Sequence, residues 1–352
     1  MNFLKKYSGY IVLAFLVYIL YSTVRSDSFF HRIFSLGAFK KNVIAALPAD
    51  KNNFSFEKAV LDLDAVFDPV FDRKSTEEQI QSLAQRVGEK INGDADPEQI
   101  MAKFNESMFN DYGFIFDAKA NALLYQGGGG GTFSTEDFLN YQSLGRVLQR
   151  RQGICLSLTT LYLIIGDRLK IPVYGVIMPG HIFVRYQDLN HSGINSETTF
   201  GGVEYYGYKG SFGTEFMDNP DTVYNKCVDK STVLAAILNN FSIMYSNQKD
   251  YSKAEFLLKK SMELAPYLPE SHLGLGAIYA DMGRLNEAKA ELEKALGLFP
   301  GAAGAELLLG AIYLEEKDFG PAEEHLMKAL KAKNTAQKAA EELELLKKQR
   351  GS

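Results

Sequence analysis

The chain has 352 residues, enough for two or three domains, and its hydrophobic content of 46% is sufficient for packed cores. A formal net charge of −5 gives no reason to expect nucleic acid as a partner. Two cysteines, Cys155 and Cys227, are too few for a disulfide framework or a zinc site, and the five histidines show no metal-ligand spacing. We therefore expect no metal and no other cofactor.

An uncharged segment, residues 7–24, follows Lys5 and Lys6 at the start of the chain. At about 1.5 Å per residue it makes a helix of about 27 Å, which just spans a hydrocarbon core of about 30 Å. Tyrosines lie near both of its ends, as they do at membrane interfaces. A cleaved signal peptide is the alternative, but its apolar core would be unusually long, and no small-residue cleavage site follows. We predict a single-pass transmembrane anchor within residues 1–24.

Basic residues flank this segment on both sides, so its orientation is open. Lys5 and Lys6 favour an N-terminus inside the cytoplasm. Four basic residues on the other flank oppose that choice: Arg25, Arg32, Lys40 and Lys41. We favour the arrangement that puts the rest of the chain on the periplasmic or extracytoplasmic side.

Residues 25–53 form a juxtamembrane linker, in which apolar residues between positions 29 and 36 predict an amphipathic helix along the membrane. A helical region follows over residues 54–110. Helical spacing of apolar residues predicts a helix over 56–67, a capping box at 75–78 opens one that runs to about residue 91, and Asp96-Pro97 opens another. Five glycines at 127–131 then predict either a slack loop or a flap near an active site.

A cysteine, a histidine and a carboxylate follow in an order that suggests chemistry. Cys155 opens an apolar run over residues 156–165, which predicts a buried helix with the thiol in its first turn. A thiol ionises more easily at a helix N-terminus, and the thiolate is the nucleophile. His181 begins the second of two strands, and Glu197 lies in a third extended piece, with Asn195 as the alternative acid position. The pattern is typical of a thiol triad, although each residue also has a structural interpretation. Cys227 has no histidine near it in the sequence and is interpreted as structural.

Residues 232–349 repeat with a period of 34. Gly276, Tyr279 and Ala288 return as Gly310, Tyr313 and Ala322, and a weaker copy precedes them. Small residues at these positions let two antiparallel helices approach, and the pattern resembles the tetratricopeptide repeat. A helix over 335–350 would cap the array. The concave face of the array would bind a protein or peptide, or the repeats would only support the preceding domain.

Several segments resemble the SirB1-type transglutaminase-like domains, which in bacteria often carry such repeats. The resemblance lies in residues 104–114, 138–155, 161–163, 171–186 and 194–202. It implies an α+β core, with a central helix packed on an antiparallel sheet and a helical N-terminal part, followed by an all-α solenoid. The implied domains are residues 54–231 and 232–352.

By position, the resemblance makes Cys155 the nucleophile, His181 the base and Glu197 the acid that orients the histidine. Many such domains lack the cysteine, and this sequence keeps it. The sequence thus supports a membrane-anchored acyl-transfer enzyme acting as a protease, amidase or transglutaminase, with a repeat domain for protein binding. The rival interpretation is an inactive membrane-tethered scaffold in a larger envelope assembly.

Overall fold

The computed structural model describes residues 35–93, 96–120, 134–190, 193–203 and 222–351. Its contacts divide the chain into two units, residues 1–46 and 47–352. In the first unit, residues 35–46 are helical. Within the described ranges no helix is both long and apolar enough to cross a membrane, and the predicted anchor lies outside them. The five-glycine run at 127–131 also lies outside the described residues.

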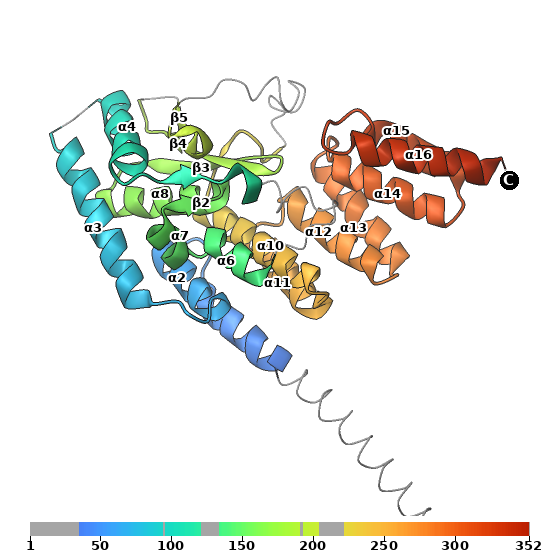
Figure 1. Cartoon of the computed structure of the whole chain (residues 1–352), viewed down its shortest axis with the longest axis horizontal. Helices are drawn as coiled ribbons and strands as arrows, with labels where there is room; N and C mark the ends of the chain where they lie inside the picture. Colours follow the sequence, from blue (N-terminus) through green and yellow to red (C-terminus); the bar gives the residue numbers. More distant parts are fainter. Residues whose placement is uncertain (1–34, 94–95, 121–133, 191–192, 204–221, 352) are drawn as a thin grey trace, which may run out of the picture. The chain divides into compact units, whose positions relative to one another are not determined.

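The second unit begins with helices and leads into one small sheet (Figure 1). The helical region and its first strand are α2 (Phe56–Phe67), α3 (Arg73–Ile91), α4 (Pro97–Asn105), the π-helical turn η1 (Glu106–Asp111) and β1 (Ile115–Phe116). The part that leads to the sheet contains α6 (Thr135–Gln142), α7 (Leu144–Arg150), β2 (Gln152–Gly153) and α8 (Cys155–Leu169). The sheet region contains β3 (Val173–Met178), β4 (His181–Tyr186), β5 (Ile194–Ser196), the 3-10 turn η2 (Thr198–Phe200) and β6 (Cys227–Val228).

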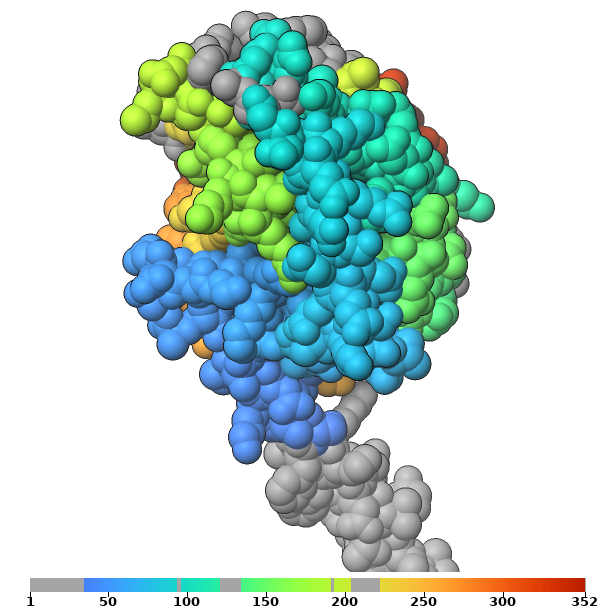
Figure 2. All heavy atoms as spheres, turned by 90° about the vertical axis from the view of Figure 1, so that its left-hand side faces the viewer, coloured from blue at the N-terminus to red at the C-terminus, as the bar shows by residue number. Residues whose placement is uncertain are grey.

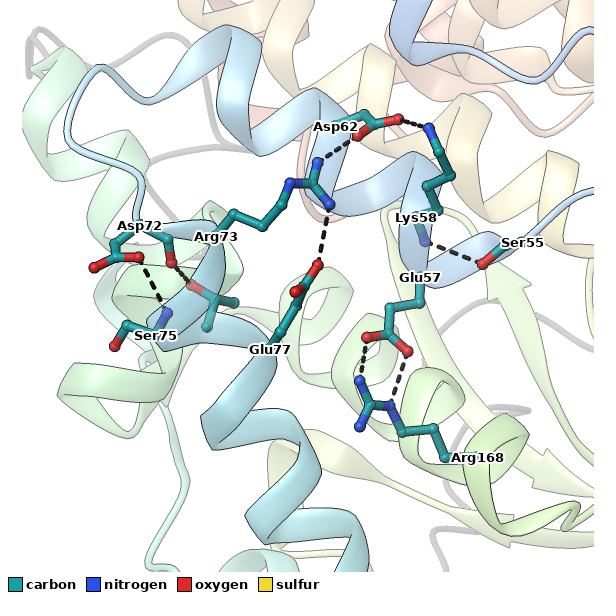
Figure 3. Close-up of polar contacts among 10 residues, drawn as sticks. Ser55, Glu57, Lys58, Asp62, Asp72, Arg73, Ser75, Glu77 and Arg168 are labelled. Carbon is teal, nitrogen blue, oxygen red and sulfur yellow. Dashed lines mark hydrogen bonds and ion pairs between the residues drawn. The ribbon is translucent and has the colours of Figure 1, made fainter.

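Local sequence signals explain most of the helix starts. Ser55 caps α2 by accepting a hydrogen bond from the Lys58 amide, and Asp96 caps α4 just before Pro97. The prediction that a capping box at 75–78 begins α3 was wrong. Asp72 is the cap, and its carboxylate accepts from the Ser75 amide at 3.0 Å (Figure 3).

Charged pairs tie these helices to one another and to α8. Arg73 on α3 contacts both Asp62 on α2 and Glu77, and Arg168 near the end of α8 forms a two-pronged pair with Glu57 (Figure 3). Figure 2 looks onto this side of the unit, where α3 and α4, in cyan, cover the core. Because these pairs are partly exposed, each stabilises the fold only modestly, by at most about 1 kcal/mol.

The antiparallel sheet has the strand order β5-β4-β3-β6 and carries α8 against β3 and β4. Twelve of the fifteen residues of α8 are buried, which matches the uninterrupted apolar run in its sequence. The helix approaches β3 very closely at Gly166, where an added Cβ would lie 2.2 Å from the Val173 side chain. Glycine at this position therefore sets the distance between the central helix and the sheet.

Six helices pair into three repeats, and a seventh follows them, as the 34-residue period predicts. They are α10 (Lys230–Asn247), α11 (Tyr251–Leu264), α12 (Pro269–Asp281), α13 (Leu285–Leu298), α14 (Ala303–Glu315), α15 (Phe319–Ala329) and α16 (Ala336–Arg350). The glycines that recur with the 34-residue period let the paired helices approach closely, as expected. A Cβ on Gly276 or Gly310 would lie under 3 Å from Leu292 or Leu326 of the paired helix. The last helix packs on α14 and α15.

The first repeat helix, α10, also packs into the preceding core. Phe241 stacks on Phe67 of α2 with ring centroids 3.8 Å apart and lies 5.4 Å from Phe138 of α6. Asn240 donates to Gln142 at 2.9 Å across the same interface. The repeats therefore share part of the hydrophobic core with the sheet-containing region.

The second and third repeats contain the same His–Glu pair in opposite order. His272 on α12 lies 2.6 Å from Glu291 on α13, whereas 34 residues later Glu306 on α14 faces His325 on α15. In the first repeat the same two positions hold Leu238 and Leu257, both fully buried. The repeat thus accepts either a polar pair or an apolar pair at this contact.

This interchange predicts a non-additive effect of substitution. His272→Leu or Glu291→Leu alone leaves a partly buried polar partner without its hydrogen bond and should destabilise the chain by about 1–3 kcal/mol. The double variant recreates the first repeat and should stay within about 1 kcal/mol of the wild type. Urea unfolding of the four proteins measures the coupling, and a double variant as unstable as the two single effects combined would contradict it.

Candidate active site

Cys155 is the first residue of α8 and is fully buried. The chain reaches it through Arg151, which ends α7 in the left-handed region, and through Gly153, which pairs with Phe116 in a two-stranded parallel ribbon. Ser157 fixes the entry to the helix, because its hydroxyl accepts from the Ile154 amide at 3.0 Å and donates to the Tyr141 carbonyl at 2.6 Å. The sequence places a thiol at the start of a buried helix, as predicted.

His181 is the first residue of β4, and its ring joins the other two predicted residues. Its Nε2 lies 2.8 Å from the Glu197 carboxylate, and the Cys155 thiol lies near enough to raise the pKa of the ring. Since Nε2 faces the carboxylate, Nδ1 is the ring nitrogen left for the thiol. Burial alone would lower the pKa of His181, but the interactions with Cys155 and Glu197 outweigh it and raise the pKa to about 10. The site therefore favours the imidazolium form.

Glu197 directly follows β5 and caps the short turn η2. Its side chain is only 1% exposed, and both of its oxygens are engaged. One faces His181, and the other accepts from the backbone amide of Thr199 at 2.9 Å and from its hydroxyl at 2.7 Å. A buried carboxylate is tolerated only when it is bonded in this way, so the turn specifies both its position and its orientation.

A second polar cluster holds the segment that carries Glu197, and no motif in the sequence predicted it. The Asn105 side-chain oxygen accepts from Tyr162 at 3.0 Å and from Ser196 at 2.6 Å, and its amide donates to the Gly202 carbonyl at 2.8 Å. Tyr162 lies inside the apolar run of α8, where a buried hydroxyl needs a partner. That need was the only clue to the cluster in the sequence.

Asn195, the alternative third residue, does not meet the histidine. Its side-chain oxygen accepts from Arg185 at 2.7 Å, and Arg185 also donates to Asn225. Cys227 lies on β6, where its thiol donates to Gln187 at 3.0 Å. Burial raises the pKa of the Cys227 thiol. The structure therefore brings together Cys155, His181 and Glu197 and leaves Asn195 and Cys227 apart from them.

The described residues contain no group of three or more His, Cys, Asp or Glu side chains arranged to hold a metal ion. Chemically, the three side chains form a line of thiol, imidazole and carboxylate. The imidazole can take the thiol proton, and the carboxylate stabilises the resulting positive charge.

Comparison with known families identifies both parts of this unit. Residues 74–200, which include all three side chains, match the transglutaminase-like superfamily model, and residues 247–295 and 281–343 match a tetratricopeptide repeat model. The chain carries a transglutaminase-like domain followed by tetratricopeptide repeats. The sequence resemblance is confirmed at this level.

Two curated relatives match part of the chain. Both are called UPF0162 protein and come from Xylella fastidiosa strains 9a5c and Temecula1 / ATCC 700964. Each is 28% identical over 149 residues, which cover 40% of this chain and 52% of the relative. The chain thus spans about half the length of the curated relatives that it matches.

Two solved structures share a distant likeness. The crystal structure of menin that reveals the binding site for Mixed Lineage Leukemia (MLL) protein is 12% identical with a TM-score of 0.41, covering 77% of this chain and 69% of menin. The crystal structure of yeast Tom70 is 16% identical with a TM-score of 0.32, covering 83% and 58%. Likenesses at this level say nothing about function.

The raised pKa of His181 predicts how stability of the transglutaminase-like domain depends on pH. An unfolded histidine has a pKa of about 6.5, so the folded chain holds this proton more tightly between about pH 6.5 and 10. The contribution of His181 to the free energy of unfolding is complete below pH 6.5 and is lost as pH rises through about 10. We expect the free energy of unfolding to fall over this range, by up to about 1.4 kcal/mol per pH unit from this group.

Urea titrations at several pH values measure this dependence. His181→Gln should show a flatter decline, and Cys155→Ser should flatten it in part, because each variant removes one side of the contact. An equal pH dependence in the wild type and in His181→Gln would rule out the imidazolium as its source.

Proposed function

We propose that the chain is a SirB1-type, thiol-dependent acyl-transfer enzyme in which Cys155 is the nucleophile, His181 the base and Glu197 the orienting acid. The observation that supports this most is the histidine ring, which interacts with a thiol at a helix N-terminus and with a buried carboxylate. A structural cysteine in a helix needs neither partner. The proposed domains are residues 54–231 for the catalytic part and 232–352 for the repeats.

The proposed reaction has two steps. His181 holds the proton of Cys155 as an imidazolium, and the Cys155 thiolate attacks the carbonyl carbon of a carboxamide or peptide. Backbone N–H groups at the start of α8 stabilise the oxyanion, and the carbon–nitrogen bond breaks as the imidazolium returns its proton to the leaving amine. In the second step, water or another amine gives a proton to His181 and displaces the thiolate from the thioester. Water gives a protease or amidase, and an amine gives a transglutaminase.

The reactivity of Cys155 tests this proposal, because Cys227 provides an internal control. Iodoacetamide should alkylate Cys155 at least tenfold faster than Cys227 at pH 6.5, where an ordinary thiol with a pKa of about 8.5 is about 1% ionised. Burial alone predicts the opposite order, since Cys155 is fully buried and Cys227 is not. Rates are measured by mass spectrometry on Cys227→Ser and Cys155→Ser, each of which leaves one thiol.

His181→Ala, made in the Cys227→Ser background, should slow the alkylation of Cys155 by about tenfold or more. Equal and slow labelling of the two thiols, unaffected by this substitution, would contradict the enzyme. That result would favour the second candidate, a catalytically inactive scaffold whose repeats bind a partner in a larger envelope protein assembly. The repeats themselves support a protein or peptide partner under either function.

We also propose that residues 7–24 anchor the chain in a membrane, with the remainder in the periplasm or outside the cytoplasm. The support is the uncharged length of this segment and its terminal tyrosines. The full chain should stay with membranes in alkaline carbonate and leave them in detergent, whereas a variant that lacks residues 1–30 should be released by buffer. Extraction of the full chain by carbonate would contradict the proposed membrane anchor. Protease digestion of intact spheroplasts reports the orientation of the chain.

A further inference from the structure

A half-buried glutamate of the second repeat is hydrogen-bonded to the segment before β6. Glu270 is in the first turn of α12, and Tyr224 donates a hydrogen bond to its Oε1 at 2.7 Å. The Tyr224 ring packs edge-on against Phe299, at the end of the same repeat, with centroids 4.7 Å apart. The segment before β6 is therefore anchored in the second repeat.

This contact is also linked to the end of β3. Burial raises the pKa of the Glu270 carboxyl, against the lowering effect of the Tyr224 hydrogen bond and of nearby backbone amides, and Oε2 has no hydrogen-bond partner among the described residues. Gly180 has a φ of +68°, a conformation that glycine adopts without strain, and His181 is the next residue. The neighbour of Tyr224, Asn225, donates from its amide to the Ile177 carbonyl on β3 at 2.9 Å.

The repeat pattern does not require a glutamate at this position. The equivalent residues, 34 positions before and after Glu270, are Ala236 and Gly304. A buried carboxyl costs several kcal/mol unless it is well bonded, and a small or apolar side chain would avoid that cost. Glu270 is thus specific to the second repeat, and its hydrogen bond goes to Tyr224 in the segment before β6.

We propose that Glu270 is a positioning residue for His181: through Tyr224 and Asn225 it holds the end of β3, where Met178 pairs with His181, and so sets where the imidazole meets Cys155 and Glu197. The inference rests on the proposed function for its catalytic meaning. It makes the second repeat a part of the active site. A partner that shifts α12 would then change the reactivity of Cys155.

The test combines two measurements on the full chain. The first is the pH titration of the His181 imidazole by ¹⁵N NMR, and the second is the alkylation rate of Cys155 in the Cys227→Ser background. In Glu270→Ala we expect the pKa of His181 to fall by about 1 or more, toward 6.5, and the alkylation rate to drop about fivefold or more. Glu270→Gln keeps an acceptor for Tyr224 and should retain most of both properties.

Glu291→Ala is the matched control, because Glu291 belongs to the same repeat and pairs with His272 instead of Tyr224. It should lower the stability of the repeat and leave both measurements unchanged. A folded Glu270→Ala with an unaltered His181 titration would overturn the proposal, and so would an equal effect of Glu291→Ala.

Tyr224→Phe covers the case in which Glu270→Ala fails to fold. It removes only the hydroxyl and keeps the ring on Phe299, so it should shift the His181 titration in the same direction by a smaller amount, and no shift would again overturn the inference. The titration needs no turnover. If Cys155 of the wild type is unreactive, the proposed enzymatic function is contradicted. The His181 titration still decides whether Glu270 positions the imidazole ring.

Discussion

The candidate site depends on one buried carboxylate. Glu197 is almost completely removed from water, which is tolerated only because His181 takes one of its oxygens and Thr199 takes the other. The geometry of a three-residue turn thus decides where the imidazole lies, and the imidazole in turn decides how the thiol is partnered. Asn105 extends this dependence to the helical region, because it joins the central helix to both ends of that turn.

Polar residues also hold the helices and the sheet of this unit together. The apolar face of α8 supplies the burial, and Gly166 lets the helix lie unusually close to β3. This packing sets the depth of the helix on the sheet, and the hydrogen bonds of Tyr162 to Asn105 and of Ser157 to the Tyr141 carbonyl add defined partners on neighbouring helices. The position of Cys155 relative to His181 is therefore set by hydrogen bonds acting within an apolar interface.

Strong local patterns made many of the helices, three of the sheet strands and the repeats predictable, whereas the two-residue strands β1, β2 and β6 were not predicted. The 34-residue period, the caps at Ser55 and Asp96, and the apolar run after Cys155 each reflect short-range physics that a sequence displays directly. Strand geometry alone could not separate Glu197 from Asn195, because two residues two positions apart point to the same side of an ideal strand, and the resemblance alone favoured Glu197. The end of β5 and the capping of η2 separate them. Asn105 and Glu270 were missed because their partners lie 91 and 46 residues away.

The relation between the repeats and the core also follows from particular side chains. In a solenoid, each repeat normally contacts only the repeats next to it. A repeat array can therefore fold without packing on another domain. Here α10 uses Phe241 and Asn240 to pack on the core, and the following repeat reaches the sheet through Tyr224. An aromatic stack resists sliding less than a buried hydrogen bond does, because it has no fixed donor and acceptor. Movement of the array on the core would thus strain the Asn240–Gln142 and Tyr224–Glu270 hydrogen bonds before the aromatic stack, and the second of these is linked to the end of β3 opposite His181.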